Sequence, residues 1–304
     1  MGWLLELDTS GVRDLTLTGG DPPLITLRTA EEALLHYAMH SGAPYGRQSL
    51  PRLDSHDPLG DLRPALLDAL RAPNEVPLPR VQMGAVTVLS SYDGRLHAIQ
   101  AGEHTVTLMI DGEHVELLRD YAAGVLATDL DRELGTVGVL TGDGALHVFQ
   151  QHVRVGVYSL DLALDGCRPT VFLPDGSGTV VVSDEGRACV FNTAGRVLAQ
   201  ATCPAELCSA SVAPAGEWIV RYGGMRGAIR VHDARLTAVR QGTGDDLRAA
   251  SRSVQLFRAG DDFSEGIGAL VVADDGTLAF VQGRLLCCAH LSALAPLPLE
   301  QPLF

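Results

Sequence analysis

The chain has 304 residues, with 46% hydrophobic and 20% charged residues and a formal charge of -14. This balance is typical of a globular protein and excludes disorder along the whole chain. No apolar run approaches the roughly 18 residues that a membrane span needs. The acidic excess also disfavours binding to nucleic acid or to anionic membranes.

All 23 basic residues are arginine. The absence of lysine excludes Schiff-base chemistry, lysine general bases and the phosphate-binding loop that needs a lysine. The six cysteines show no CxxC spacing, so neither a zinc site nor a disulfide framework is expected. The start, MGWLLE, lacks the basic and apolar segments of a secretory signal, and free thiols in such a chain predict a cytoplasmic protein.

The first 29 residues predict strands. Residues 3–10, 12–18 and 24–29 are short runs rich in apolar and β-branched residues, and glycine-containing turns separate them. We expect residues 1–29 to contribute to a closing part of the fold.

Residues 30–80 predict a helical insertion. Thr29 is a favourable helix cap, and Glu31 and Glu32 follow it in the first turn of a helix over ALLHYAM. An irregular loop is expected at residues 42–58.

A second helix is expected at residues 59–71, because three leucines recur there at helical spacing. They are Leu66, Leu67 and Leu70.

Residues 81–304 carry an internal repeat. Five segments share an apolar strand, a glycine-containing turn and a second apolar strand, at residues 86–100, 137–150, 180–192, 219–233 and 270–282. Their turn glycines are separated by 50, 42, 41 and 49 residues. Period-two apolarity after a glycine turn predicts β-hairpins with one buried face.

Further strands flank several hairpins, as at residues 125–135 before one and 152–160 after it. Four short strands in a unit of about 40 to 50 residues are typical of a β-propeller blade. The segment TVFLPDGSGTVVVSDEGRACVFN, residues 170–192, resembles the WD-repeat family. The signature Trp-Asp is absent, since Ile99-Gln100 and Phe149-Gln150 stand in its place.

The resemblance implies an all-β propeller. Five blades are visible in the sequence, and the N-terminal strands would supply a sixth, with the helical insertion between them. Five blades beside a separate N-terminal domain remain an alternative, and seven would need strands that the sequence does not show.

No catalytic or metal-binding motif stands out, so no catalytic residue, cofactor or metal is assigned. His97 and His147 occupy the same repeat position, where packing or hydrogen bonding is the expected role. Asp pairs such as Asp274-Asp275 suit turns. They would also suit calcium in the central channel of a propeller hydrolase of the lactonase or esterase type, which is an alternative function.

The strongest functional signal is a cluster of arginines. Residues 187–258 hold ten Arg against five acidic residues, within an acidic chain. Five of the arginines form a candidate partner-binding sector: Arg221, Arg226, Arg230, Arg235 and Arg240. Guanidinium groups bind carboxylates and phosphates, so the sector predicts a protein partner with an acidic surface. Few aromatic residues accompany it, so a nucleic-acid surface is a weaker alternative.

From these observations we expect a non-catalytic protein-interaction scaffold, or a subunit of a multiprotein assembly, in the cytoplasm. Fold alone does not fix function, so this expectation depends on the arginine sector and on the resemblance.

Overall fold

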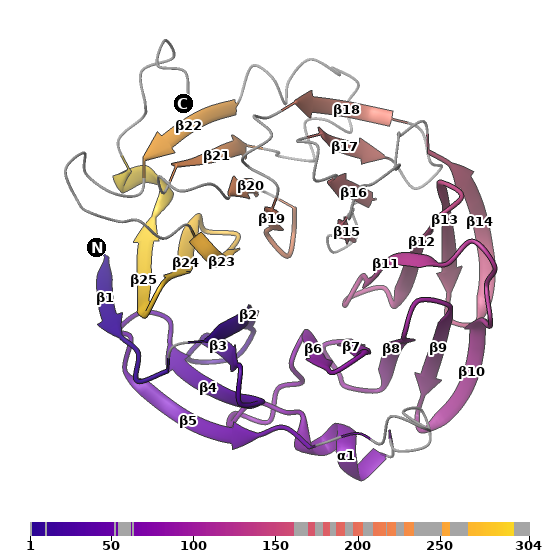
Figure 1. Ribbon diagram of the computed structural model, residues 1–304, viewed down its shortest axis with the longest axis horizontal. Coiled ribbons are helices and arrows are strands. Elements are labelled where there is room, and N and C mark those ends of the chain that lie inside the picture. The colour runs from indigo at the N-terminus through magenta and orange to yellow at the C-terminus, as the bar shows by residue number, and fades with distance from the viewer. Residues whose placement is uncertain are drawn as a thin grey trace.

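Strands make up almost all of the regular structure, and they form small antiparallel sheets arranged in a ring (Figure 1). The structure is a computed structural model. It describes residues 2–9, 11–51, 53, 62, 64–160, 170–173, 179–182, 187–191, 197–202, 209–216, 218–222, 228–233, 251–255 and 267–294. The chain is therefore all-β with a propeller-like arrangement, and it contains very little helix.

The described strands pair into six sheets. The first contains β2 (Val12–Thr18), β3 (Leu24–Thr29), β4 (Ala33–Ala38) and β5 (Pro44–Ser49). The second contains β6 (Arg80–Met83), β7 (Val86–Ser90), β8 (Leu96–Ala101), β9 (Thr105–Ile110) and β10 (Glu113–Leu118). The third contains β11 (Val125–Leu130), β12 (Thr136–Thr141), β13 (Ala145–Gln150) and β14 (Val153–Ser159).

The remaining sheets follow in chain order. The fourth contains β15 (Thr170–Phe172), β16 (Thr179–Val182), β17 (Arg187–Phe191) and β18 (Val197–Thr202). The fifth contains β19 (Ser209–Val212), β20 (Trp218–Tyr222), β21 (Ala228–Asp233) and β22 (Ser251–Gln255). The last, which we call the closing sheet, contains β23 (Ile267–Val272), β24 (Thr277–Gln282), β25 (Leu285–His290) and β1 (Trp3–Glu6).

The predicted hairpins are confirmed. Each of the five repeat segments is an antiparallel pair: β7 with β8, β12 with β13, β16 with β17, β20 with β21, and β23 with β24. In the first of them the Ser91 hydroxyl donates to Asp93 Oδ1 at 2.6 Å, and Gly94 has a positive φ of 68°. A side-chain-bonded turn that ends in a left-handed glycine is what the repeated Asp-Gly sequence predicts.

The helix expected after Thr29 is wrong, because these residues form β4. The Thr29 hydroxyl oxygen accepts the Ala33 amide at 3.2 Å, four residues ahead, whereas a helix cap accepts the amide two or three residues ahead. Glu32 also has a positive φ of 58°, which a helix does not allow, and its amide donates to the Thr29 carbonyl oxygen at 3.2 Å. The threonine therefore closes a tight turn between β3 and β4.

The predicted loop at 42–58 is also partly wrong, since β5 lies inside it. Residues 33–38 and 44–49 complete a four-stranded sheet, so the first part of the predicted insertion belongs to the ring.

The second predicted helix is present as α1 (Pro64–Ala69), followed by a short turn. Leu67 and Leu70 are buried against the β6–β10 sheet, and Leu66 packs beside them. Within the described part of residues 30–80, helix is confined to α1.

The N-terminal strands do not build one blade. β1 pairs antiparallel with β25, with Trp3 opposite Cys288 and Glu6 opposite Leu285. The strands β2 and β3 instead begin a different sheet. The closing sheet thus combines both ends of the described chain, as Figure 1 shows where β1 lies beside β25.

The core lies between neighbouring sheets. One buried cluster joins the second and third sheets through Leu89, Val106, Val139 and Phe149. Another joins the closing sheet to the first sheet through residues such as Leu27 and Leu286. Apolar interfaces of this kind hold neighbouring sheets of the ring together. In the described residues, no helix is long and apolar enough to cross a membrane.

Candidate functional site

A cavity of about 190 Å³ lies where inner strands of the ring converge. Residues of β2, β6, β11, β19 and β23 line it, and these strands face the centre of the ring in Figure 1. Its wall is largely apolar, with Leu15, Leu89 and Val272 among its residues. Its charged groups are Asp129, Arg80 and Arg132.

Asp129 connects the third sheet to the fourth. Its Oδ2 accepts the backbone amide of Leu173, which directly follows β15, at 2.7 Å. Burial raises the pKa of Asp129 to about 6, although the Leu173 amide and the charge of Arg80 act in the opposite direction. A carboxyl group held by a backbone amide of the next strand has a structural task.

Arg132 connects the third sheet to the second. Its Nε donates to the Ser90 carbonyl oxygen at 2.9 Å, and its Nη2 donates to the Pro77 carbonyl oxygen at 3.2 Å. The guanidinium carbon also lies 4.1 Å from the centroid of the Tyr92 ring. These contacts fix the loop after β11 onto the neighbouring sheet.

Arg80 acts on two carboxyl groups. It lines the central cavity, and it also lines a small space of about 10 Å³ between the first and second sheets. Burial raises the pKa of Asp14 in that space, and the charge of Arg80 opposes the rise, as it does at Asp129. Arg80 thus partly compensates two half-buried acids that come from different sheets.

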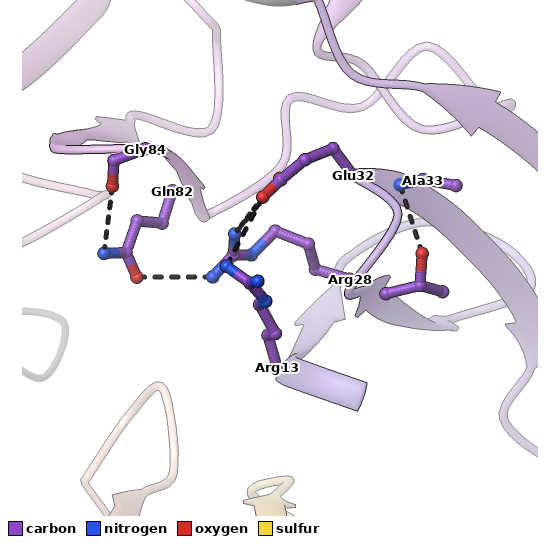
Figure 2. A network of polar contacts seen from close by, with 7 residues as sticks. Arg13, Arg28, Glu32, Ala33, Gln82 and Gly84 are labelled. Atoms are coloured by element: carbon purple, nitrogen blue, oxygen red, sulfur yellow. Dashed lines mark hydrogen bonds and ion pairs between the residues drawn. The ribbon is translucent and has the colours of Figure 1, made fainter. Parts of the chain in front are cut away.

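A polar network continues between the first and second sheets (Figure 2). Arg28 Nη1 donates to the Glu32 carboxylate at 3.2 Å, and Arg28 Nη2 donates to Gln82 Oε1 at 3.4 Å. Arg13 approaches the same carboxylate at 3.6 Å. The Arg28 side chain is 8% exposed and that of Arg13 is 56% exposed, so the buried member of the pair bridges the sheets.

The histidines at the shared repeat position are both buried, as expected for packing residues. His97 Nδ1 lies 2.8 Å from the Ser90 hydroxyl oxygen. Neither ring nitrogen of His147 has a hydrogen-bond partner in the described residues, and its ring packs edge-on against Tyr121 with centroids 5.3 Å apart. Burial lowers the pKa of both imidazoles, which keeps them neutral at physiological pH.

The acidic pair Asp274-Asp275 serves turns. Asp274 Oδ1 accepts the Ala215 amide at 2.8 Å, and Asp275 Oδ1 accepts the Thr277 amide at 2.8 Å. Across the described residues, no three His, Cys, Asp or Glu side chains lie together in a way that could hold a metal ion.

The adjacent thiols Cys287 and Cys288 are free and buried on β25. Burial raises the pKa of each thiol to about 11, so both remain protonated at neutral pH. A protonated buried thiol is a poor nucleophile.

The predicted arginine sector lies partly on the fifth sheet. Arg221 is in β20 and Arg230 is in β21, and their Cα atoms are partners in the antiparallel register. Arg226, Arg235 and Arg240 lie outside the described residues. The structure therefore brings two of the five arginines together.

Sequence reasoning missed the charged residues around the cavity. Arg28 could have been noticed, since it is the one charged residue of LITLRT, a strand that the structure buries throughout. Asp129 and Arg80 gave none, because their proximity depends on how separate sheets meet.

No family model matches the chain, and no curated protein matches it. Among solved structures, the crystal structure of Raptor from Chaetomium thermophilum is similar, with a TM-score of 0.61 at 11% sequence identity. The likeness covers 94% of this chain and 28% of that chain. At this identity the likeness shows a shared fold.

Proposed function

We propose that this chain is a non-catalytic protein-interaction scaffold, or a subunit of a multiprotein assembly, that acts in the cytoplasm. Each of the six sheets would be one blade of a degenerate WD-repeat-like propeller. The observation that carries the proposal is how the polar groups at the cavity are used. Asp129 bonds to Leu173, and Arg132 bonds to Ser90 and Pro77, so these groups hold neighbouring sheets together.

A ring held in this way is a rigid support whose outer surface and loops are free to contact other molecules. The neutral buried histidines and protonated thiols described above fit the same interpretation, because they pack within the sheets and are not prepared as reacting groups.

The partner surface is proposed to be the arginine sector, residues Arg221, Arg226, Arg230, Arg235 and Arg240. The register pairing of Arg221 with Arg230 supports it, since residues directly opposite in an antiparallel pair share one sheet face. Guanidinium groups bind carboxylates, so an acidic protein surface would suit this sheet face.

The test is affinity purification of the tagged chain from its native cells at low and high salt, with protein identification and metal analysis of the eluate. Reversal of Arg221 and Arg230 to Glu should remove a stoichiometric protein partner. The matched control is Arg119→Glu, because Arg119 is exposed and lies at the end of β10 in another sheet.

A partner that survives the double reversal would overturn the assigned surface. A chain that elutes alone, binds about one equivalent of calcium and hydrolyses esters or lactones would overturn the scaffold and favour the hydrolase. Nucleic acid in the eluate that is lost steeply with salt would favour the third alternative.

A further inference from the structure

Strand β14 exposes three valines on the outer side of the third sheet. Val153, Val155 and Val157 are 55%, 54% and 48% exposed. Exposed valines on an edge strand are unusual, because an unprotected edge can pair with another chain.

Two other outer strands carry protective residues, and β1 of the closing sheet, which exposes Leu4, also exposes Glu6. β5 exposes Pro44 and Arg47, and β10 exposes Glu113 and Glu116. Proline and charged side chains at such positions prevent unwanted strand pairing. β14 has Arg154 as its one charged residue.

A bulge does not account for the difference. The register of β13 and β14 shifts between Arg154 and Gly156, so Val155 has no Cα partner in β13. The outer pairs β4–β5 and β9–β10 contain register shifts as well. The irregularity is therefore common to outer strands, whereas the valines are particular to β14.

The valines are not needed to hold β14 in place. The strand pairs with β13 from Val153 to Ser159, and Tyr158 packs on the buried Leu140, Leu146 and Leu160. In the described residues no strand pairs with the outer edge of β14. The strand is thus anchored on one side and open on the other, at the rim of the ring in Figure 1.

We propose that the outer edge of β14 binds an extended segment of a partner protein, which adds to the third sheet as a further strand. This inference rests on the proposed scaffold function. The segment carries apolar residues, which cover the exposed valines, and an Asp or Glu beside Arg154.

The positive charge of Arg154 favours an acidic partner segment over a second copy of this chain. Arg154 is exposed and makes no hydrogen bond or ion pair with the described residues. A second copy of the chain would pair β14 with β14, which supplies no carboxylate for either arginine. Two copies would also each bring a formal charge of -14. A partner strand with a carboxylate satisfies both the valines and the arginine.

The experiment uses a displayed library of random 12-residue peptides, selected against the full chain and counter-selected against the Val155→Lys variant. Enriched peptides are synthesised with a fluorophore, and their dissociation constants are measured by anisotropy. We expect several apolar residues in the enriched peptides, with Asp or Glu among them. Val155→Lys and Arg154→Glu should each weaken binding by at least about tenfold.

Two controls make the result specific. Leu134→Lys introduces the same charge at a residue that is 57% exposed, in the turn between β11 and β12, and it should leave binding unchanged. A peptide whose acid is replaced by Lys should bind Arg154→Glu more tightly than it binds the natural chain. Circular dichroism melts check that each variant is folded.

Several results would overturn the inference: no enriched peptide, enriched peptides that bind Val155→Lys equally well, or a chain that sediments as a dimer and becomes monomeric in Val155→Lys. If the native partner of the arginine sector is retained by Val155→Lys while no peptide binds, the scaffold function stands and the β14 proposal fails. If peptides bind β14 and no native partner depends on the arginines, the β14 proposal stands and the arginine sector fails as the partner surface.

Discussion

The indole Nε1 of Trp3 donates a hydrogen bond of 2.9 Å to the carbonyl oxygen of Met39. Trp3 belongs to β1 in the closing sheet, and Met39 directly follows β4 in the first sheet. A Cβ added at Gly42 would lie 2.7 Å from the Trp3 ring, so the indole also covers the turn after β4. One side chain therefore connects the two sheets between which the chain closes its ring.

Replacing Trp3 with Ala should destabilise the ring at this junction. The change removes the hydrogen bond and the packing over Gly42, and we expect the free energy of unfolding to fall by about 2 kcal/mol. Urea unfolding followed by circular dichroism measures it. Leu4→Ala on the same strand is the control, since Leu4 is 62% exposed and its loss should cost under about 0.5 kcal/mol. Equal losses in both variants would contradict the assigned role of Trp3.

The two arginines that share Glu32 should differ in importance. Arg28→Ala leaves Glu32 and Gln82 without their buried partner, so a loss of about 3 kcal/mol is expected. Arg13→Ala removes an exposed ion pair and should cost under about 1 kcal/mol, with less effect at high salt. Chemical denaturation in low and high salt tests both. A larger loss for Arg13→Ala would show that the network in Figure 2 is not what stabilises this junction.

His147 and His97 should respond oppositely to replacement by Phe. In His147→Phe the edge-on contact with Tyr121 is kept and two buried unpaired nitrogens are removed, so stability should rise by about 1 kcal/mol. In His97→Phe the Ser90 hydroxyl loses its partner, and stability should fall by a similar amount, about 1 kcal/mol. Thermal melts of both variants at neutral pH measure these changes in stability. A lower melting temperature for His147→Phe would contradict the prediction.

Asp129 should make stability depend on pH. Its folded pKa, about 6, lies above the ordinary value of 3.8, so the folded chain prefers the protonated form. The contribution of Asp129 is therefore fully present below about pH 4 and is lost as the pH rises through about 6.

The matched variant is Asp129→Asn, which keeps an acceptor for the Leu173 amide and cannot ionise. Relative to this variant, the natural chain should lose about 2 kcal/mol between pH 4 and pH 8. Urea unfolding of both proteins at the two pH values measures the difference. A gap that does not change with pH would mean that Asp129 does not titrate as described.

The sequence predicts the repeated hairpins well, because each is a local pattern. A period of two, an Asp-Gly turn and a second apolar strand lie within 15 residues of one another, as in residues 86–100. The helix predicted after Thr29 failed for a related reason. A threonine followed by two glutamates suits both a helix start and a tight turn, and the left-handed Glu32 that separates the two cases has no sequence signal.

The cavity could not be predicted, because it is not local. Asp129, Arg80 and Asp14 lie on three different sheets, and their charges interact once the ring has closed. The arginine sector was predicted from the local excess of arginine. The structure places two of its members, Arg221 and Arg230, opposite each other in register. The valines of β14 resemble those of any strand in the sequence, and their exposure follows from the position of β14 at the edge of its sheet.

The pairing of β1 with β25 also sets an order of events during synthesis. Trp3 leaves the ribosome before its ladder partner Cys288, which follows 285 residues later. Until then β1 has no strand to pair with, and the apolar side chains of the first sheet that later meet the closing sheet stay open to water. Contacts between such distant residues form slowly, and exposed strand edges invite mispairing in the meantime. Between the synthesis of Trp3 and that of Cys288 the ring is thus an open arc, and it is in that interval that chaperones would have most to protect.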